Sequence, residues 1–348
     1  MASNVVGVDI GSVSIRAVEV ANAASQKPRV IKCGEIALPP GAVRRGEVIE
    51  PNTVASALKR LWSQSGFTSK KVVLGIGNQR VLARDLSVPA MPLGQIRESL
   101  PFHVQDLLPM PVSEAVLDFY PLSESDGEGG RVINGLLIAA AKETVLTNLS
   151  ATRMAGLKPI GVDLIPFALT RMISRTEQTS APIVVIDIGE STTSFVYSVK
   201  GVPQFVRLIG MGGGDVTRAI AGRLSMDEAS AEKAKRVLGL AAEQVSETDR
   251  LIVEIIYELT SELVTSIRNT ITYIANTHGA TNIDRIVLSG NGARLAGLPR
   301  ALAEYTRIPV TASDPFDTIA MSAKAKKTDP KELNGMAVAL GLTLGVAA

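Results

Sequence analysis

The sequence predicts an α/β protein built from two related lobes, and three observations carry this prediction. The chain has 348 residues, 46% of them apolar, which is enough for two compact domains with substantial cores. A strand-like segment that ends in Asp-Ile-Gly occurs twice, at Asp9 and at Asp187. Strand-like runs also lead through Gly-rich junctions into helical patterns at 210–217 and 289–294.

The repeated segment predicts a β-hairpin at the start of each lobe. Residues 5–14 are VVGVDIGSVS and residues 184–193 are VVIDIGESTT, so the two aspartates lie 178 positions apart, about half the chain. Each copy has a β-branched strand, a tight turn with glycine and a second strand, over 15–20 and over 194–199. Two copies at this spacing indicate two lobes of common topology.

Each predicted turn suits a phosphate group. Gly11 and Gly189 let the backbone approach a bound group, and the hydroxyls of Ser12, Thr192 and Thr193 add donors. Asp9 and Asp187 end their strands beside the turns, where carboxylates can hold Mg²⁺ through its waters. For one copy alone, Asp-Ile-Gly is more simply a turn signal, and the second copy favours the ligand site. Arg16 either reaches the same phosphate or is a solvated surface arginine.

Two later segments carry further candidate ligand residues. The junction with Gly212, Gly213 and Gly214 begins a predicted helix that continues through Leu224, and its unpaired N–H groups could face a phosphate. The alternative is a flexible joint with Asp215 as N-cap. Helix-face spacing also groups three charged residues that could hold a ribose and stack a purine, or form a solvated surface: Glu232, Lys235 and Arg236.

A last Gly-rich turn follows a predicted strand over 283–288 and precedes a helix that begins near Leu298. Its candidate residues are Gly290, Asn291, Gly292 and Arg294. A lone Gly-x-Gly between strand and helix is a weak sign of nucleotide binding. It is informative here because it follows the two hairpins and the earlier Gly-rich junction in order.

In this order the motifs resemble those of the superfamily of actin, sugar kinases and heat-shock chaperone ATPases, over essentially the whole chain. The resemblance implies ATP and Mg²⁺ as ligands. It implies that Asp9, Gly11, Ser12 and Arg16 contact phosphates. It also implies that Glu232, Lys235 and Arg236 form an adenosine clamp. Gly290 and Gly292 would then lie against the nucleotide, with Arg294 flanking the base.

The region between the two hairpins has its own pattern. We expect strands over 81–88, 116–122 and 132–141, a helix over 92–108, and an exposed hairpin loop over 123–130. The runs RVLAR, VPAMP, ESLPFH, LPMP and LDFY, which start at 80, 88, 98, 108 and 117, resemble the PilM family of type IV pilus assembly proteins. The resemblance implies an inserted subdomain where FtsA also has one. The expected parts are lobe I over 1–80 and 153–182, the insert over 81–152, lobe II over 183–334 and a closing helix over 335–348.

Membership of that family implies an ATP-binding cytoplasmic adaptor in the inner-membrane assembly platform of a type IV pilus or a related type II secretion system. The implied partner is the N-terminal peptide of a PilN-like membrane protein, bound in a groove between lobe I and the insert. That partner would hold the chain indirectly at the inner face of the cytoplasmic membrane. Leu82, Leu86 and Phe102 are candidate groove residues, with ordinary core packing as the alternative, and self-association stays open.

Composition excludes several other classes. With 36 basic and 34 acidic residues the net charge is close to zero, so no overall electrostatic field favours nucleic-acid binding. One cysteine, Cys33, and two histidines cannot build a disulfide framework or a zinc cluster. The N-terminus lacks the pattern of a signal peptide, and the apolar run over 335–348 is short of the roughly 20 residues that cross a bilayer.

We expect ATP hydrolysis to be slow at most. In chaperone relatives an acidic residue that positions water precedes a proline, and Ile165 stands at that place here, with Asp163 as a substitute two positions earlier. A sugar kinase would need an acceptor motif, which does not follow the first hairpin. The main alternative is an FtsA-like filament-forming division protein, although that family ends in an amphipathic helix and this chain in an apolar run.

Overall fold

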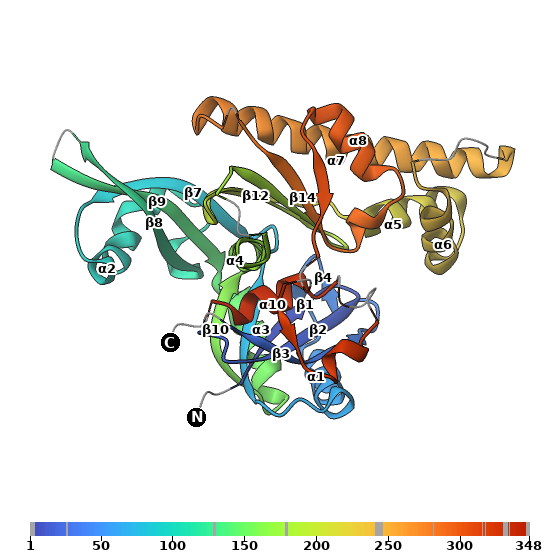
Figure 1. Ribbon diagram of the computed structural model, residues 1–348, viewed down its shortest axis with the longest axis horizontal. Helices are drawn as coiled ribbons and strands as arrows, with labels where there is room; N and C mark the ends of the chain where they lie inside the picture. The colour runs from blue at the N-terminus through green and yellow to red at the C-terminus, as the bar shows by residue number, and fades with distance from the viewer. Residues whose placement is uncertain are drawn as a thin grey trace.

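The computed structural model describes residues 4–25, 27–127, 130–177, 180–240, 246–280, 282–314, 316, 318–329, 333 and 335–345. Three sheets of three or more strands and one two-stranded hairpin organise these residues (Figure 1). We call the six-stranded sheet with its helices lobe I, the five-stranded sheet with its helices lobe II, and the three-stranded sheet with its helix the inserted sheet.

The bounds are as follows. Lobe I contains β1 (Val5–Ile10), β2 (Ser14–Ala21), β3 (Arg29–Ala37), β6 (Lys71–Ile76), β10 (Lys158–Leu164) and β16 (Ala320–Met321), the small hairpin β4 (Val43–Arg44) and β5 (Glu47–Val48), the helices α1 (Pro51–Ser65), α3 (Lys142–Met154), α4 (Ile165–Glu177) and α10 (Ala337–Thr343), and the 3₁₀ turn η4 (Ala325–Lys327). Lobe II contains β11 (Ile183–Ile188), β12 (Thr193–Val199), β13 (Val202–Ile209), β14 (Arg285–Ser289) and β15 (Val310–Ala312), with α5 (Gly213–Leu224), α6 (Glu228–Leu238), α7 (Glu247–Thr277), η3 (Gly292–Arg294) and α8 (Leu298–Thr306). The inserted sheet contains β7 (Val81–Pro89), β8 (Ala115–Gly127) and β9 (Gly130–Ala141), with α2 (Leu93–His103), η1 (Gln105–Leu107) and η2 (Val112–Glu114).

The two lobes share one strand order. Lobe I runs β10-β6-β1-β2-β3, with β16 added at the end, and lobe II runs β15-β14-β11-β12-β13. In both lobes the first strand pairs antiparallel with the strand after its turn and parallel with the strand on its other side. The predicted two-lobed α/β fold is therefore confirmed, and the sequence repeat corresponds to a repeat of topology.

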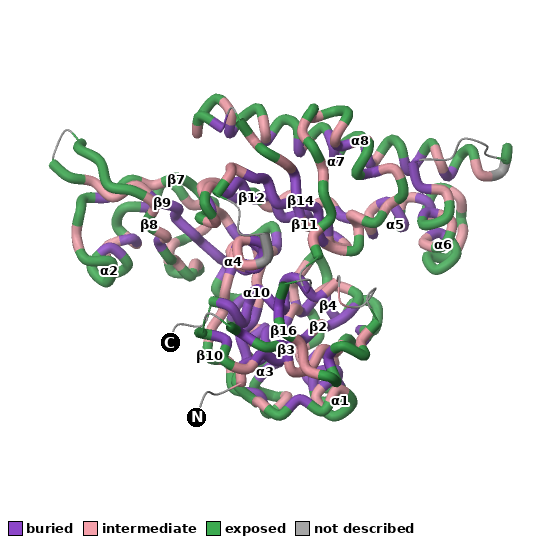
Figure 2. The backbone as a smooth tube through the Cα atoms, in the orientation of Figure 1, coloured by how far each residue is buried: buried purple, intermediate pink, exposed green. Residues whose placement is uncertain are grey.

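Helices cover both faces of the lobe I sheet. One apolar core lies between this sheet and α1, and a second core joins α4 and α10 to both lobes, since it contains Leu169 of α4 and Val185 of β11. Buried positions concentrate in these central layers, as Figure 2 shows. The α10 backbone lies directly on β1, because a Cβ at Gly7 would come within 1.9 Å of the Ala339 carbonyl oxygen. Only glycine permits so close an approach.

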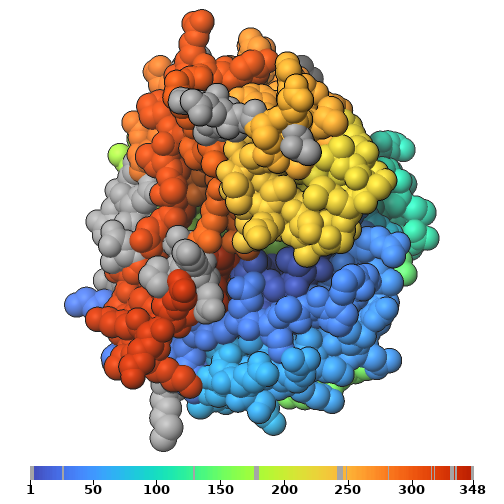
Figure 3. All heavy atoms as spheres, turned by 90° about the vertical axis from the view of Figure 1, so that its right-hand side faces the viewer, coloured from blue at the N-terminus to red at the C-terminus, as the bar shows by residue number. Residues whose placement is uncertain are grey.

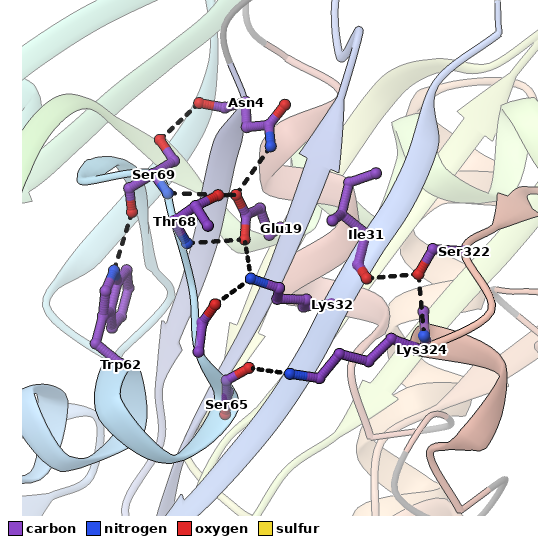
Figure 4. Close-up of polar contacts among 12 residues, drawn as sticks. Asn4, Glu19, Ile31, Lys32, Trp62, Ser65, Thr68, Ser69, Ser322 and Lys324 are labelled. Carbon is purple, nitrogen blue, oxygen red and sulfur yellow. Dashed lines mark hydrogen bonds and ion pairs between the residues drawn. The ribbon is translucent and has the colours of Figure 1, made fainter.

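A segment that returns from lobe II fastens to the edge of lobe I (Figure 4). There β16 pairs with β3, the Ser322 hydroxyl donates to the carbonyl of Ile31 at 2.7 Å, and Lys324 Nζ donates to the carbonyl of Ser65 at 3.0 Å. This last contact supplies a cation at the C-terminal end of α1, where carbonyl groups lack helical partners. The attachment fixes the path of the chain towards α10.

Figure 4 also shows Glu19, a fully buried carboxylate on β2. It accepts hydrogen bonds from Asn4 Nδ2 at 2.9 Å and from the backbone amides of Thr68 and Ser69, both at 3.2 Å, and Lys32 Nζ lies 3.9 Å away. Burial alone would raise the pKa of Glu19, but the hydrogen bonds from Thr68 and Asn4 outweigh it and lower the pKa. The ionised carboxylate thereby ties the loop after α1 to the sheet.

The inserted sheet differs from expectation at two places. The expected helix over 92–108 is wrong at its end, because α2 stops at His103 and η1 follows. Pro101 lies in the last turn and has no N–H to continue the helical hydrogen bonds. The expected loop over 123–130 is also wrong, since β8 pairs with β9 as far as Gly127 and Gly130, although residues 128–129 lie outside the described residues.

Candidate functional site

The two predicted hairpins face each other across the lobes. The hydroxyl oxygens of Ser12 and Ser191 lie 3.1 Å apart, within hydrogen-bond distance, although 179 positions separate them. The turns have the same form, because the Gly11 amide donates to the Ser14 carbonyl at 3.0 Å and the Gly189 amide to the Thr192 carbonyl at 2.9 Å. The two copies of the sequence repeat therefore lie against each other at the junction of the lobes.

Asp9 lies in the first hairpin among charged neighbours. Arg16 Nη1 is 4.0 Å from Asp9 Oδ2, while Arg16 Nη2 is 3.0 Å from a carboxylate oxygen of Glu35. Burial raises the pKa of Asp9 to about 6; Arg16 opposes this rise, and Asp187 and Glu35 add to it. The contribution of Asp187 shows that the two repeated aspartates are within electrostatic reach of each other.

Asp187 is the counterpart in lobe II. Burial raises the pKa of Asp187 as well, against the lowering effects of the Ser289 side chain and Arg16. The junction of the lobes thus contains two half-buried carboxyl groups from opposite lobes, and the pKa of each is raised. A cation between them, directly or through water, would relieve the cost of their ionisation. The described residues contain no group of three or more His, Cys, Asp or Glu side chains placed to hold a metal ion.

The Gly-rich junction packs on the second hairpin. The Gly213 amide donates to the Gly189 carbonyl at 2.9 Å and the Gly214 amide to the Glu190 carbonyl at 2.7 Å, while the Gly212 amide donates to the Asp215 carboxylate at 2.8 Å. The expectation that these amides are unpaired is therefore wrong. Glycine is needed instead for close approach, since a Cβ at Gly212 would lie 2.6 Å from the Gly189 carbonyl oxygen.

The charged face of α6 is partly engaged by α5. Lys235 is 8% exposed, and its Nζ donates to the Gly213 carbonyl and to Thr217 Oγ1, both at 2.8 Å. Glu232 lies 2.5 Å from Lys235 Nζ and 2.6 Å from Arg236 Nε. Burial would raise the pKa of Glu232, but hydrogen bonds from Lys235, Thr217 and Arg236 lower it. Arg236 is the exposed member of the predicted clamp.

The last Gly-rich turn reaches the same junction of the lobes. A Cβ at Gly213 would lie 3.2 Å from Gly292 Cα, and one at Gly290 only 2.4 Å from the Ile188 carbonyl oxygen, so this turn packs on the strand that carries Asp187. Asn291 Oδ1 and Arg16 Nε lie 3.5 and 3.1 Å from the Cβ position of Gly335, which brings lobe I, lobe II and the return segment together. Arg294 ends η3 in the next turn of chain.

Three candidate residues were missed in the sequence, and the hydroxyl of one predicted residue is hydrogen-bonded within the protein. Ser191 contacts Ser12, whereas the hydroxyl of the predicted Thr193 donates to the Met211 carbonyl at 2.7 Å and so holds the Gly-rich junction. Thr192 contributes its carbonyl to the turn. Ser191 could have been chosen because it lies in the same turn, but Glu35 and Gly335 carry no local signal.

Asp163 lies on β10, two strands away from β1 in the lobe I sheet. It accepts a hydrogen bond from Arg171 on α4 and one from the Leu164 amide at 2.8 Å. Burial raises the pKa of Asp163, against the effect of Arg171. Asp163 and Ile165 lie in different elements, because β10 ends at Leu164 and Ile165 begins α4. Ile165 packs on β6, with its side chain 3.0 Å from the Cβ position of Gly75.

Figure 3 shows the side of the molecule where the lobes separate. Lobe II residues near α6, in yellow, overhang the blue surface of lobe I, and a hollow between them has N-terminal atoms in dark blue at its floor. The hairpins, the Gly-rich junction and the last Gly-rich turn thus converge at one junction. Of the helices that the structure describes, none has the length and apolarity required to span a lipid bilayer.

Two lobes of one topology that meet through paired hairpins define a two-lobed actin-like protein. The fold is shared with MreB 5 of Spiroplasma citri bound to AMPPNP, at a TM-score of 0.54 and 11% identity over 97% of this chain and 94% of that one. It is also shared with the ethanolamine utilization protein EutJ from Carboxydothermus hydrogenoformans, at 0.58 and 14% over 98% and 89%.

The chain belongs to the family of type IV pilus assembly protein PilM, whose family model matches residues 7–347. A solved PilM-PilN type IV pilus biogenesis complex contains a chain similar to this one, with a TM-score of 0.85 and 28% identity over 99% of this chain and 98% of that one. Cell division protein FtsA of Bacillus subtilis (strain 168) is 21% identical over 261 residues, which are 68% of this chain and 58% of FtsA. The sequence-based assignment to the PilM family is therefore confirmed.

Proposed function

We propose that this chain binds ATP with Mg²⁺ in the cleft between its lobes and acts in the nucleotide-bound form as an adaptor of a pilus assembly platform. The observation that carries the nucleotide proposal is the contact of the two hairpins, with Ser12 and Ser191 3.1 Å apart beside the half-buried Asp9 and Asp187. Phosphates bound there would contact both lobes at once, so the nucleotide would hold the lobes together.

The residues present fit a magnesium polyphosphate. Asp9 and Asp187 would hold Mg²⁺ through its waters, and the bound ion would neutralise phosphate charge. Arg16 would donate to a phosphate oxygen, with the hydroxyls of Ser12 and Ser191 as further donors. The adenosine would then contact two groups of residues, Glu232, Lys235 and Arg236 on α6 and Gly290, Asn291, Gly292 and Arg294 in the last Gly-rich turn. Arg236 is the exposed charged group among them, paired with Glu232.

Calorimetric titration of ATP with Mg²⁺ tests this site. We expect binding by the intact chain, and at least tenfold weaker binding in Asp9→Ala and in Gly11→Val. For Gly11→Val the reason is steric, because a Cβ at Gly11 already lies 3.1 Å from the Ser14 carbonyl oxygen. Asp126→Ala, on the exposed end of β8, is the matched control. Unchanged affinity in both hairpin variants would remove the first hairpin from the site.

For the partner, we propose the N-terminal peptide of a PilN-like membrane protein, on the similarity to the solved PilM-PilN complex. That interaction would bring the chain to the inner face of the membrane. Of the three groove candidates, Phe102 is 80% exposed on α2, while Leu86 is half-buried against the small core of the inserted sheet and Leu82 is half-buried on β7.

Lobe I offers a second candidate surface for the peptide. A cavity of about 300 Å³ lies along β10, the end strand of the lobe I sheet, and its lining includes Ile160, Asp163 and Arg171. An extended peptide could add its backbone to such an edge, as in β-augmentation. Asp118 of the inserted sheet acts electrostatically on Asp163, so the inserted sheet stands close to this cavity.

Titration of a PilN-derived peptide into two variants separates these surfaces. Ile160→Asp changes a side chain that is 42% exposed beside the cavity, and Phe102→Ala removes the exposed ring on α2. Val237→Ala, on α6 and 73% exposed, is the control on lobe II. We expect Ile160→Asp to weaken binding at least tenfold and the control to change nothing. Absence of binding to the unaltered chain would refute the adaptor proposal.

The FtsA similarity supports a second candidate function, a filament-forming division protein. Sedimentation with ATP and Mg²⁺ distinguishes the two. Polymers that pellet with nucleotide, together with no binding of the PilN-derived peptide, would favour the FtsA-like function over the adaptor.

A further inference from the structure

A row of charged residues crosses three adjacent strands of lobe I. Asp9 on β1 is the register partner of Arg16 on β2, and Arg16 is the register partner of Glu35 on β3. Glu35 lies outside every motif that the sequence contains.

Lobe II shows that the fold does not require this row. Its equivalent positions are Asp187 on β11, Ser194 on β12 and Leu208 on β13, in the same register. The aspartate is common to both lobes, whereas the arginine and the second carboxylate occur in lobe I alone. Leu208 shows that the sheet accepts an apolar residue at the position of Glu35. The sheet itself therefore does not require a carboxylate there, and the contacts of Glu35 indicate its function.

Glu35 engages one edge of the Arg16 guanidinium. Glu35 Oε1 accepts from Arg16 Nε at 3.0 Å and lies 3.0 Å from Arg16 Nη2, and it also accepts from the Ser14 hydroxyl at 2.5 Å. Arg16 Nη1 lies on the side of Asp9, at 4.0 Å from Asp9 Oδ2. The Cβ position of Gly335 lies 3.1 Å from Arg16 Nε, so the return segment limits the space around the guanidinium.

We propose that Glu35 is a positioning residue for nucleotide binding: it fixes the guanidinium of Arg16 so that its free N–H groups face the bound phosphate, and it keeps Arg16 from closing onto Asp9. An arginine side chain has many rotamers, and fixing one in advance removes an entropy cost from binding. Keeping Arg16 away from the Asp9 carboxylate leaves that group available to the Mg²⁺ waters. This inference rests on the proposed nucleotide function.

The sign of the effect separates positioning from simple electrostatics. Removal of a negative charge beside an anionic ligand strengthens binding if charge alone decides. If Glu35 positions Arg16, its removal weakens binding instead. A merely structural role of Glu35 would lower stability and would not depend on Arg16.

Calorimetric titration of ATP with Mg²⁺ into the full chain tests the inference. Glu35→Leu reproduces the lobe II residue, and we expect it to bind about tenfold more weakly, the scale of one charge-assisted hydrogen bond. Glu35→Gln keeps an acceptor oxygen for Ser14 and Arg16 and should stay within about threefold of the unaltered chain. In an Arg16→Ala background, Glu35→Leu should have no further effect.

Glu258→Ala is the matched control, because Glu258 forms a bidentate pair with Arg223 on lobe II at 2.6 and 2.7 Å. Thermal melting without nucleotide verifies that each variant folds. Two results would overturn the inference while the proposed function stands, provided that the unaltered chain binds ATP. In the first, Glu35→Leu binds ATP equally well or more tightly. In the second, Glu35→Leu lowers the affinity by the same factor in the Arg16→Ala background. If the unaltered chain binds no ATP, the proposed function and this inference fall together.

Discussion

Asp9→Asn should stabilise the free protein while it weakens nucleotide binding. Asparagine keeps the shape of the side chain and removes the charge, so it imitates the protonated form of Asp9. The pKa of Asp9 is raised from 3.8 to about 6, mainly by burial. Between these values the folded chain holds a proton that the unfolded chain has lost, so the stability that Asp9 contributes falls as pH rises through this window.

The magnitude follows from the shift. About two pKa units at about 1.4 kcal/mol each give a cost near 3 kcal/mol for ionised Asp9 at pH 7.5. Asp9→Asn should therefore raise the free energy of unfolding by up to about 3 kcal/mol at pH 7.5 and by about half as much at pH 5, where folded Asp9 is already largely protonated.

Urea unfolding without nucleotide measures this gain. Trp62 is the only tryptophan and lies in α1 of lobe I, so its fluorescence reports on the lobe that contains Asp9. Asp126→Asn, on the exposed end of β8, should change stability at neither pH. A loss of stability in Asp9→Asn at pH 7.5, or an equal gain at both pH values, would refute the burial argument. Added ATP with Mg²⁺ should raise the melting temperature of the unaltered chain and leave that of Asp9→Asn nearly unchanged.

Three further outcomes are expected. Gly212→Ala should lower both ATP affinity and lobe II stability, by about 1–3 kcal/mol in urea unfolding, because the added Cβ would lie 2.6 Å from the Gly189 carbonyl oxygen; unchanged values would argue against the close approach. Lys235→Met should lower the free energy of unfolding by about 2 kcal/mol, since Glu232 loses its buried cation; a more stable variant would contradict this. Phosphate release with ATP should stay below about 1 s⁻¹, because Ile165 cannot orient water and Asp163 is held by Arg171; faster release that Asp163→Ala abolishes would assign the base to Asp163.

Much of the fold could be predicted because its signals are local. The hairpin strands expected over 15–20 and 194–199 are observed as β2 and β12, and the helix expected near Leu298 begins there. The errors lie where local signals compete. Pro101 shortened α2, and a Ser, Glu and Gly-rich run that is typical of a loop continues β8, because its pairing with β9 overrides its weak strand propensity.

The sequence by itself determined the two hairpins, their aspartates and the membership of the PilM family, because each depends on a short run of residues in order. The tertiary structure alone decided which groups meet. The Ser12–Ser191 contact depends on how the lobes dock, and the place of Glu35 beside Arg16 depends on the register of β2 against β3. It also decided that the amides of Gly213 and Gly214 bond to the second hairpin. Such pairings join residues distant in the chain, so no local pattern of residue types encodes them.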